Sequence, residues 1–360
     1  FAEKPAGYGY KTVRKMKIYR YTSAAGWVFF ITTLCSLLLP ARVTAEPFEK
    51  RLDRLKNNIP ALDLNSPPQP SPEAVSYFQY YGIDYEDAAH YFGYFKSRDY
   101  KIVTHILMPA ASRGTVFLLH GYLDHTGLLK NIIHLLLSMG FAVATYDLPG
   151  HGLSSGERVA IDDFSEYASV FNDFITLFAP RLPTPLHLIG HSTGCAIAYE
   201  YLHQHTVHPF DRIIFLAPLV HSNHWRLSKA GHWLTDPFID KIPRTFKENT
   251  SDGNYLAFLA GDPLQSRHIP LKWITAMYAW EEKIHDYPGI DQPLCIIQGQ
   301  DDSVVDWRYN ISFLKDKIGP VNIKLIPEAK HQLINERVDL RLKIFHEIRI
   351  CLEKGKERSP

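Results

Sequence analysis

The segment LHLIGHSTGCAIAYEYL, residues 186–202, constrains the fold more than any other part of the chain. It begins as an apolar strand, breaks at residues 190–194, and resumes with apolar residues at helical spacing. A serine between two glycines at such a junction is typical of a sharp strand-to-helix turn, which projects the hydroxyl of Ser192 outward. An ordinary glycine-rich turn is the alternative, and the rest of the sequence has to decide between them.

Short apolar segments alternate with helical patterns along most of the chain. Several are continuous runs, such as VFLLH and IIFLA, as expected of strands that are covered on both faces. The alternation predicts an α/β fold with a mostly parallel, doubly wound sheet. The predicted strands are Lys101–Met108, Thr115–His120, Ala142–Asp147, Leu186–Gly190, Arg212–Ala217, Leu294–Gln298 and Asn322–Ile326, and the predicted helices are Gly127–Met139, Phe164–Phe178 and Gly194–His203.

A long interval in the second half of the chain breaks this alternation. Between Ala217 and Leu294 the sequence shows no convincing strand, and the interval is too long for an ordinary connection. It is rich in tryptophan and its pattern favours helices and loops, so we expect a helical cap inserted after a central strand. The predicted core is then split into residues 98–220 and 291–354, with the cap at residues 221–290.

The first 45 residues are expected to stand outside the fold. Met16 is followed by two basic residues, an uncharged and mostly apolar run over 21–41, and a small-x-small pattern that ends at Ala45. This order is that of a secretory signal peptide cleaved after Ala45, which predicts a periplasmic or secreted protein. An uncleaved membrane anchor is the alternative, because the run is nearly long enough to span a bilayer. Residues 1–15 precede a plausible start methionine.

The next segment, residues 46–97, is expected to be an N-terminal extension of the core. Its stretch NSPPQPSPE, residues 65–73, is rich in proline and predicts an extended arm. Beyond the predicted signal the chain keeps three cysteines, Cys195, Cys295 and Cys351. An odd number in apolar surroundings favours buried thiols over a disulfide framework, and a single bridge in an oxidising compartment is the alternative.

Two predicted strands are followed by side chains that a serine nucleophile requires. One strand runs into the acidic turn QDDSVVD, and a later one runs into PEAKH. Strand carboxyl ends meet at one edge of a parallel sheet, where ligand sites collect. The serine needs a base to take its proton and an acid to fix the imidazole tautomer. We predict His331 as the base and Asp302 as the acid. Asp301 is the main alternative for the acid, ahead of Asp306.

Two backbone N–H groups are candidates for an oxyanion hole. The loop after the strand VFLLH presents the N–H of Tyr122, and the N–H of Thr193 follows the serine at the start of a helix. Together they would hold the negative oxygen of a tetrahedral intermediate. A simple turn between strand and helix is the alternative interpretation of the first loop.

The motifs HGYLDHTG, DLPGHGLSSG, GHSTG, GDPL, GQDDSVVD and EAKHQLINE follow one another along the chain. In this order they resemble α/β-hydrolases of the monoacylglycerol lipase and lysophospholipase type, over residues 98–350. The resemblance implies an α/β-hydrolase fold and a serine carboxylic-ester hydrolase that acts on glycerol-linked acyl chains beneath a cap. The family pattern places its acid three residues after the glycine, which favours Asp302. Leu123 stands where relatives often carry glycine, so the shape of that loop is expected to differ.

The cap is expected to carry substrate choice. Its aromatic and apolar residues would line an acyl-chain channel or rest on a membrane surface. Equally, they would pack the cap onto the core, because a helix has to bury its apolar face. The candidates are Trp225, Trp233, Trp273 and Met277.

Metals, cofactors and nucleic acids are not expected partners. The histidines of LHQHTVHPF and HSNHW are spaced so that neighbours do not share a helix face, and no carboxylate or cysteine pattern accompanies them. Lys and Arg number 39 against 38 Asp and Glu, without a basic region that would bind nucleic acid. A Ser-His-Asp mechanism requires no cofactor.

The expected substrate is an acyl-ester lipid. The alternative within enzymes is a small non-lipid ester or an amide. A catalytically silent binding protein that keeps the fold is a further alternative, which the intact set of Ser192, His331 and Asp302 disfavours. The oligomeric state is left open by the sequence.

Overall fold

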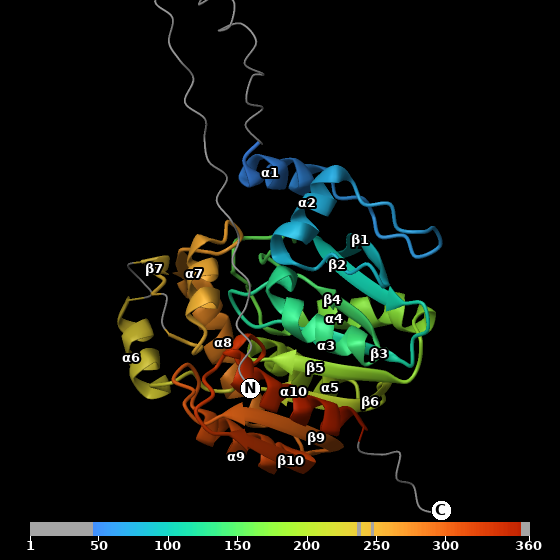
Figure 1. The fold of residues 1–360 in the computed structure, drawn as a ribbon. Coiled ribbons are helices and arrows are strands. Elements are labelled where there is room, and N and C mark those ends of the chain that lie inside the picture. The colour runs from blue at the N-terminus through green and yellow to red at the C-terminus, as the bar shows by residue number, and fades with distance from the viewer. Residues whose placement is uncertain (1–45, 236–238, 246–247, 354–360) are drawn as a thin grey trace, which may run out of the picture. The chain divides into compact units, whose positions relative to one another are not determined.

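A central sheet of eight strands organises the part of the chain that the computed structural model describes, residues 46–235, 239–245 and 248–353 (Figure 1). In spatial order the strands are β1 (Ala88–Ser97), β2 (Tyr100–Pro109), β4 (Ala142–Tyr146), β3 (Thr115–Leu119), β5 (Leu186–His191), β6 (Phe210–Leu216), β9 (Ile290–Gly299) and β10 (Ile318–Ile326). Strand β2 runs antiparallel to both of its neighbours, β1 and β4, and all other neighbouring strands are parallel. The sheet is therefore mostly parallel, as predicted.

Helices cover both faces of this sheet. They are α3 (Lys130–Ser138), α4 (Ser165–Phe178), α5 (Thr193–Gln204), α9 (Trp307–Lys317) and α10 (Val338–Glu353), with short 3₁₀ turns at Thr126–Leu129, Ala179–Arg181 and Leu333–Asn335. In β3, Phe117 and Leu119 pack into one apolar layer with α4, α5 and α9. Val116 and Leu118 pack into a second layer with α3 and α10. The predicted doubly wound α/β-hydrolase fold is thus confirmed.

The sheet begins earlier than residue 98, where the sequence placed the start of the core. Strand β1 pairs with β2 along its whole length. Its sequence, AAHYFGYFKS, mixes polar and apolar residues as an edge strand does, so it lacks the apolar run that marks the inner strands. Residues 60–62 lie along its outer side, where the Tyr94 N–H donates to the Pro60 carbonyl at 2.8 Å. A β-carbon at Gly93 would lie 2.7 Å from the Leu62 backbone, so only glycine permits this approach.

The N-terminal extension also contributes two helices, α1 (Phe48–Asn58) and α2 (Pro72–Tyr81). Both bury apolar side chains in the same layer as α3 and α10, through Leu52 and Leu55 of α1 and Tyr77 and Tyr81 of α2. The Pro-rich stretch connects the two helices. The extension is therefore packed onto the core and not attached to it as a free arm.

The cap follows β6 and precedes β9 in the chain, as predicted. Its elements are α6 (Trp225–Thr235), β7 (Lys241–Pro243), α7 (Gly253–Gly261), β8 (His268–Pro270) and α8 (Leu271–Ile284). Of these, α6, β7 and α7 are grouped beside the sheet, on the left of Figure 1. The expectation that this interval holds no strand is wrong, because β7 and β8 pair antiparallel. Each is only 3 residues long and ends in proline, which is too short for a recognisable period.

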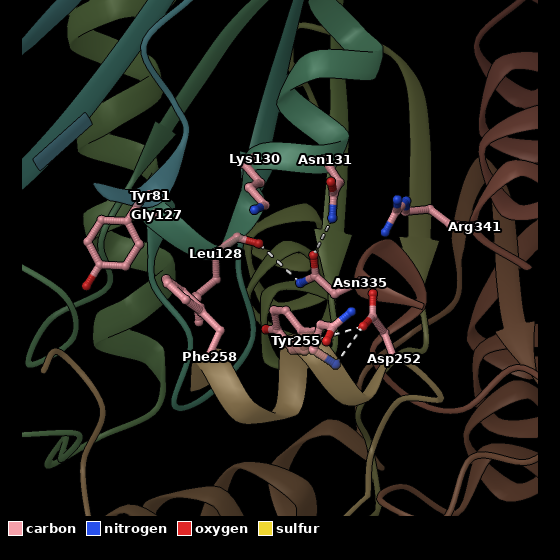
Figure 2. A pocket seen from close by; sticks show the side chains of 11 residues that line it. Tyr81, Gly127, Leu128, Lys130, Asn131, Asp252, Tyr255, Phe258, Asn335 and Arg341 are labelled. Atoms are coloured by element: carbon pink, nitrogen blue, oxygen red, sulfur yellow. Dashed lines mark hydrogen bonds between the residues drawn. The ribbon is translucent and has the colours of Figure 1, made fainter. Parts of the chain in front are cut away.

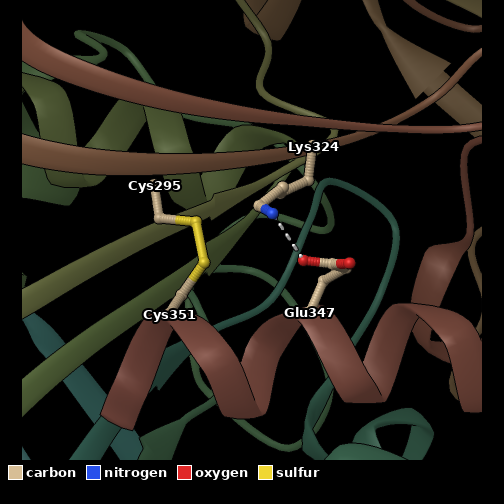
Figure 3. The surroundings of a disulfide bond; sticks show 4 residues. All are labelled: Cys295, Lys324, Glu347 and Cys351. Carbon is tan, nitrogen blue, oxygen red and sulfur yellow. Dashed lines mark ion pairs between the residues drawn. A yellow bond between two sulfur atoms is a disulfide. The ribbon is translucent and has the colours of Figure 1, made fainter. Parts of the chain in front are cut away.

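A disulfide joins Cys295 of β9 to Cys351 of α10, with the Cα atoms 6.3 Å apart (Figure 3). An ion pair between Lys324 and Glu347, at 3.0 Å, links β10 to the same helix nearby. Cys195 is a buried free thiol. The preference for three buried thiols is therefore wrong for two of them, because α10 packs on the sheet and brings together residues 56 positions apart.

The predicted signal or anchor, residues 1–45, lies outside the described residues. Among the helices that are described, none combines the length and the apolar character needed to cross a membrane.

Candidate active site

Ser192 occupies the turn between β5 and α5. Its backbone has φ 52° and ψ −113°, a conformation that L residues rarely adopt. The flanking glycines make the turn possible: a β-carbon at Gly194 would lie 2.5 Å from the Leu119 carbonyl oxygen, and one at Gly190 would lie 2.8 Å from the Cys195 nitrogen. The strained backbone and the two required glycines are the features of the predicted elbow.

The three side chains predicted from separate strand ends meet at this turn. His331 Nε2 lies 3.0 Å from Ser192 Oγ, and His331 Nδ1 lies 2.8 Å from Asp302 Oδ2. All three are buried. Of the alternative acids, Asp301 is exposed, and Asp306 accepts the Tyr309 N–H at the start of α9. Only Asp302, among these three acids, is hydrogen-bonded to His331.

Asp302 sits in a cradle of donors at the end of β9. Its Oδ1 accepts the N–H groups of Val304 and Val305 at 2.8 and 3.2 Å, and its Oδ2 accepts the Gln298 amide at 3.1 Å. Burial alone would raise the pKa of Asp302, but the charge and hydrogen bond of His331 and these donors hold it below its ordinary value. The carboxylate is therefore ionised. The sequence prediction missed Gln298, whose signal is a polar residue at the end of an apolar strand.

The loop after β3 runs against the elbow. A β-carbon at Gly121 would lie 3.2 Å from Ser192 Cβ, so the residue before Tyr122 packs directly against the elbow. The N–H of Thr193 begins α5 and has no carbonyl partner within the helix. Leu123 has φ 66°, a left-handed backbone conformation that favours glycine.

A second set of polar residues, which was not predicted from the sequence, lies behind His331. The His191 ring lies 3.1 Å from the His331 carbonyl oxygen through Nε2 and 3.7 Å from Asp124 through Nδ1. The Gln332 amide donates to both oxygens of Asp124, at 3.3 and 3.0 Å. These contacts hold the backbone at and just after His331. Their only sequence signal is that they adjoin the predicted motifs.

Comparison with known proteins shows the family to which the chain belongs. The family model described as "Serine aminopeptidase, S33" matches residues 110–338. A monoacylglycerol lipase from Mycolicibacterium smegmatis is 37% identical over 235 residues, which cover 62% of this chain and 83% of the relative. A monoglyceride lipase from Saccharomyces cerevisiae is 26% identical over 281 residues, covering 67% and 85%. The chain belongs to the monoacylglycerol lipase family of α/β-hydrolases.

A solved structure supports the fold of this monoacylglycerol lipase family member. A soluble variant of the Saccharomyces cerevisiae monoglyceride lipase, in complex with a substrate analogue, superposes with a TM-score of 0.63. The match covers 72% of this chain and 94% of that one, at 23% sequence identity. The family match begins at residue 110 and leaves the segment ahead of it uncovered.

The cap residues predicted to bind substrate divide into different environments. Trp273 of α8 stacks on the Tyr122 ring, with centroids 3.7 Å apart and planes at 15°, so it covers the loop beside Ser192. Met277 is buried in the apolar layer between cap and core. Trp225 is buried as well and stacks on His221. The side chain of Trp233 lies outside the described part of the structure.

A buried pair fastens the cap to the core. His125 Nε2, in the loop after β3, lies 2.9 Å from Asp262 Oδ2 of the GDPL motif. The Tyr81 hydroxyl of α2 donates to the other carboxylate oxygen at 2.6 Å. Burial disfavours charge on His125, but the neighbouring carboxylates, Asp262 first, raise its pKa above the ordinary value. The pair therefore joins the N-terminal extension, the core and the cap at one point.

A pocket of about 260 Å³ adjoins this junction (Figure 2). It lies between α2, α3, α7 and the segment that follows His331. Among its lining residues, the Asn131 side-chain amide donates to the side-chain oxygen of Asn335 at 2.9 Å. Ser192, His331 and Asp302 are not among its lining residues. The pocket is therefore a feature of the cap boundary and not of the candidate active site.

Proposed function

We propose that the chain is a serine ester hydrolase of the lipolytic type, with Ser192, His331 and Asp302 as its catalytic residues. The observation that carries the proposal is the position of His331, hydrogen-bonded to Ser192 on one nitrogen and to an ionised Asp302 on the other. A serine hydroxyl becomes nucleophilic only when a base is in this position.

The reaction follows from these contacts. His331 accepts the Ser192 proton as the oxygen attacks the ester carbonyl, and the N–H groups of Tyr122 and Thr193 stabilise the oxyanion. The imidazolium, held by Asp302, then protonates the leaving alcohol. Water, deprotonated by His331, attacks the acyl-enzyme and releases the fatty acid.

We propose monoacylglycerols as the substrates, with lysophospholipids as the second lipid class. The names of the relatives support a glycerol-linked acyl chain, and the aromatic stack of Trp273 over Tyr122 supplies an apolar cover beside Ser192. The family model is named after a peptidase, so an amide substrate is part of the test.

The test is a substrate panel with wild type and Ser192→Ala. It contains mono-, di- and triacylglycerols, lysophospholipids, short p-nitrophenyl esters and an aminoacyl p-nitroanilide. We expect a preference for monoacyl lipids and a loss of about 10⁴-fold or more in the variant. Hydrolysis of short esters alone would keep the catalytic residues and overturn the lipid substrate. Wild type that neither hydrolyses a substrate nor reacts with a fluorophosphonate probe would indicate a silent fold.

We also propose that the cap contacts a membrane surface. Leu227 of α6 is 75% exposed and Ile239 is 41% exposed, although both are large apolar side chains. Co-sedimentation with phosphatidylglycerol vesicles tests this contact, with Leu227→Glu as the variant. Equal sedimentation of the variant and the wild type would contradict it.

We further propose that the protein is exported, with cleavage after Ala45. The signal-like sequence supports export, and so does the Cys295–Cys351 disulfide, because such bonds persist in oxidising compartments. N-terminal sequencing of the fractionated protein tests it. A chain found at the membrane with an intact Met16 end would instead support the anchor.

A further inference from the structure

Two histidines and a glutamate converge at the base of the cap. His221 follows β6, and Glu281 and His285 lie one helical turn apart at the end of α8. His221 Nε2 lies 2.6 Å and His285 Nε2 lies 2.9 Å from the same oxygen, Glu281 Oε1. The sequence predicted no metal site because no carboxylate accompanies His221, but the fold supplies one from 60 residues further along.

His221 is held firmly in place before any ligand arrives. Its ring is stacked on Trp225, with centroids 4.4 Å apart and planes at 8°, and on Tyr309, at 3.7 Å and 5°. Its backbone N–H donates to the Asn310 side chain at 2.8 Å, and its carbonyl accepts the Asn310 amide at 3.0 Å. A rigid imidazole whose Nε2 faces two other potential ligands is a preorganised donor.

We propose that His221, Glu281 and His285 form a binding site for one divalent transition-metal ion, with Zn²⁺ as the probe. The three donor atoms lie within 4.8 Å of one another, and two imidazoles with one carboxylate are a donor set that zinc accepts. Donors at about 2.0–2.1 Å from zinc lie about 3.3 Å from each other in a tetrahedron. The contacts of Glu281 Oε1 with His221 and His285, at 2.6 and 2.9 Å, would both lengthen when an ion enters. The His285 side chain is 47% exposed, with the Tyr309 hydroxyl 3.4 Å from its Nε2, so its exposed side faces solvent into which it would move.

The surroundings leave room for a fourth ligand. All three residues line an open hollow of about 630 Å³, from which water reaches the site. Lys229 lies 3.8 Å from the other oxygen of Glu281, Oε2, and forms its shorter contact, 2.6 Å, with Glu282. Glu281 Oε1 thus remains directed at the histidines.

The site would join the cap to the loop that carries Asp302. Ser222 pairs with Val305, and the Asn223 N–H donates to the Val304 carbonyl at 2.8 Å, just beyond Asp302. An ion on His221 and α8 would therefore stabilise the folded cap base. The inference is independent of the proposed substrate and of Ser192, since it concerns a separate set of side chains.

The experiment uses the full purified chain after removal of metal with a chelator. Isothermal titration with ZnCl₂ should show one ion per chain, and Zn²⁺ should raise the Tm. His285→Gln and Glu281→Gln should each weaken binding by at least about 10- to 100-fold and abolish the Tm shift. The matched control is His268→Gln, which alters an exposed histidine of β8 in the same cap and should bind like wild type.

The alternative is a hydrogen-bonded cluster in which both Nε2 atoms carry protons and no ion enters. Wild type that binds no Zn²⁺, or His285→Gln that binds as tightly as wild type, would overturn the metal site. Cobalt provides a second measurement, because Co²⁺ held by these ligands should give the visible absorption of a low-coordinate site. That absorption should be lost in Glu281→Gln, whose amide preserves the shape of the side chain. Its persistence in that variant would also contradict the proposal.

Discussion

Two buried histidine–carboxylate pairs of nearly equal length serve different regions of this molecule. His331 lies 2.8 Å from Asp302 at the candidate active site, and His125 lies 2.9 Å from Asp262 where the cap meets the core. In both pairs burial would raise the pKa of the carboxyl group, yet histidine and further donors lower it. The two carboxylates are therefore kept ionised in the same way.

The difference lies in what the second ring nitrogen faces. His331 Nε2 is 3.0 Å from Ser192 Oγ, whereas His125 Nδ1 accepts the Gly127 N–H at 3.2 Å. An imidazole whose second nitrogen is occupied by the backbone has no nucleophile to deprotonate. A buried histidine–carboxylate pair alone does not indicate catalysis. The group that faces the second ring nitrogen distinguishes a proton-transfer site from a structural contact.

Substitution of the first carboxylate is expected to have the largest effect. Asp302→Asn should lower kcat by about 10⁴-fold, because asparagine no longer stabilises the imidazolium or its required tautomer. The rate of p-nitrophenyl ester hydrolysis measures it, with circular dichroism to show that the variant is folded. Asp301→Asn is the matched control and should keep wild-type activity. The reverse result would assign the acid to Asp301.

Substitution of the second carboxylate should affect stability and not chemistry. Asp262→Asn should lower the free energy of unfolding by about 3 kcal/mol, because a neutral amide accepts the buried hydrogen bonds of His125 and Tyr81 more weakly than a carboxylate does. The folded variant should keep kcat within about tenfold of wild type, since catalytic contacts remain. Urea unfolding and ester hydrolysis measure the two quantities.

The control for this variant is Asp252→Asn at the start of α7. Asp252 accepts the N–H groups of Asn254 and Tyr255, and asparagine caps a helix almost as well as aspartate. Its stability should change by only a few tenths of a kcal/mol. If the folded Asp262→Asn protein were inactive, the pair would be part of the catalytic machinery and the comparison would fail.

The same pair should make the free energy of unfolding depend on pH in the acidic range. The pKa of Asp262 is lowered to about 2, because the charge of His125 and the hydrogen bonds from His125 and Tyr81 outweigh burial. A carboxyl group whose pKa is lower in the folded than in the unfolded state stabilises the fold at a pH above its unfolded-state pKa. This stabilisation is lost as the pH falls through the folded-state pKa. The stability difference between wild type and Asp262→Asn should therefore shrink by about 2 kcal/mol as pH falls from about 4 to about 2. A constant difference would contradict the depressed pKa.

The sequence predicts those features whose signal lies within one segment. The inner strands are continuous apolar runs, and Ser192, Asp302 and His331 each follow the end of one, so the position of each was predictable. That the three side chains are hydrogen-bonded in this order agrees with the prediction, while their catalytic roles await the substitutions above. The edge strand β1 and the 3-residue strands of the cap carry no such period, and they were missed.

Contacts between segments that are far apart in the sequence could not be predicted from local patterns. His125 and Asp262 are 137 positions apart, and the disulfide joins Cys295 to Cys351 across 56. Each residue is unremarkable in its own segment, because its role depends on which helix or loop packs against it. GDPL was visible as a motif, but its function as a fastening of the cap required the position of His125.

The smallest expected effect concerns the N-terminal extension. The Tyr81 hydroxyl donates to Asp262 at 2.6 Å, so Tyr81→Phe removes one hydrogen bond to a buried charge while His125 remains. The free energy of unfolding should fall by about 1.5 kcal/mol, less than for Asp262→Asn. Tyr80→Phe is the matched control, because that neighbour is 37% exposed and stacks on Phe48. Equal losses in the two variants would mean that the Tyr81 hydroxyl adds nothing, and that His125 alone holds the carboxylate that fastens the cap.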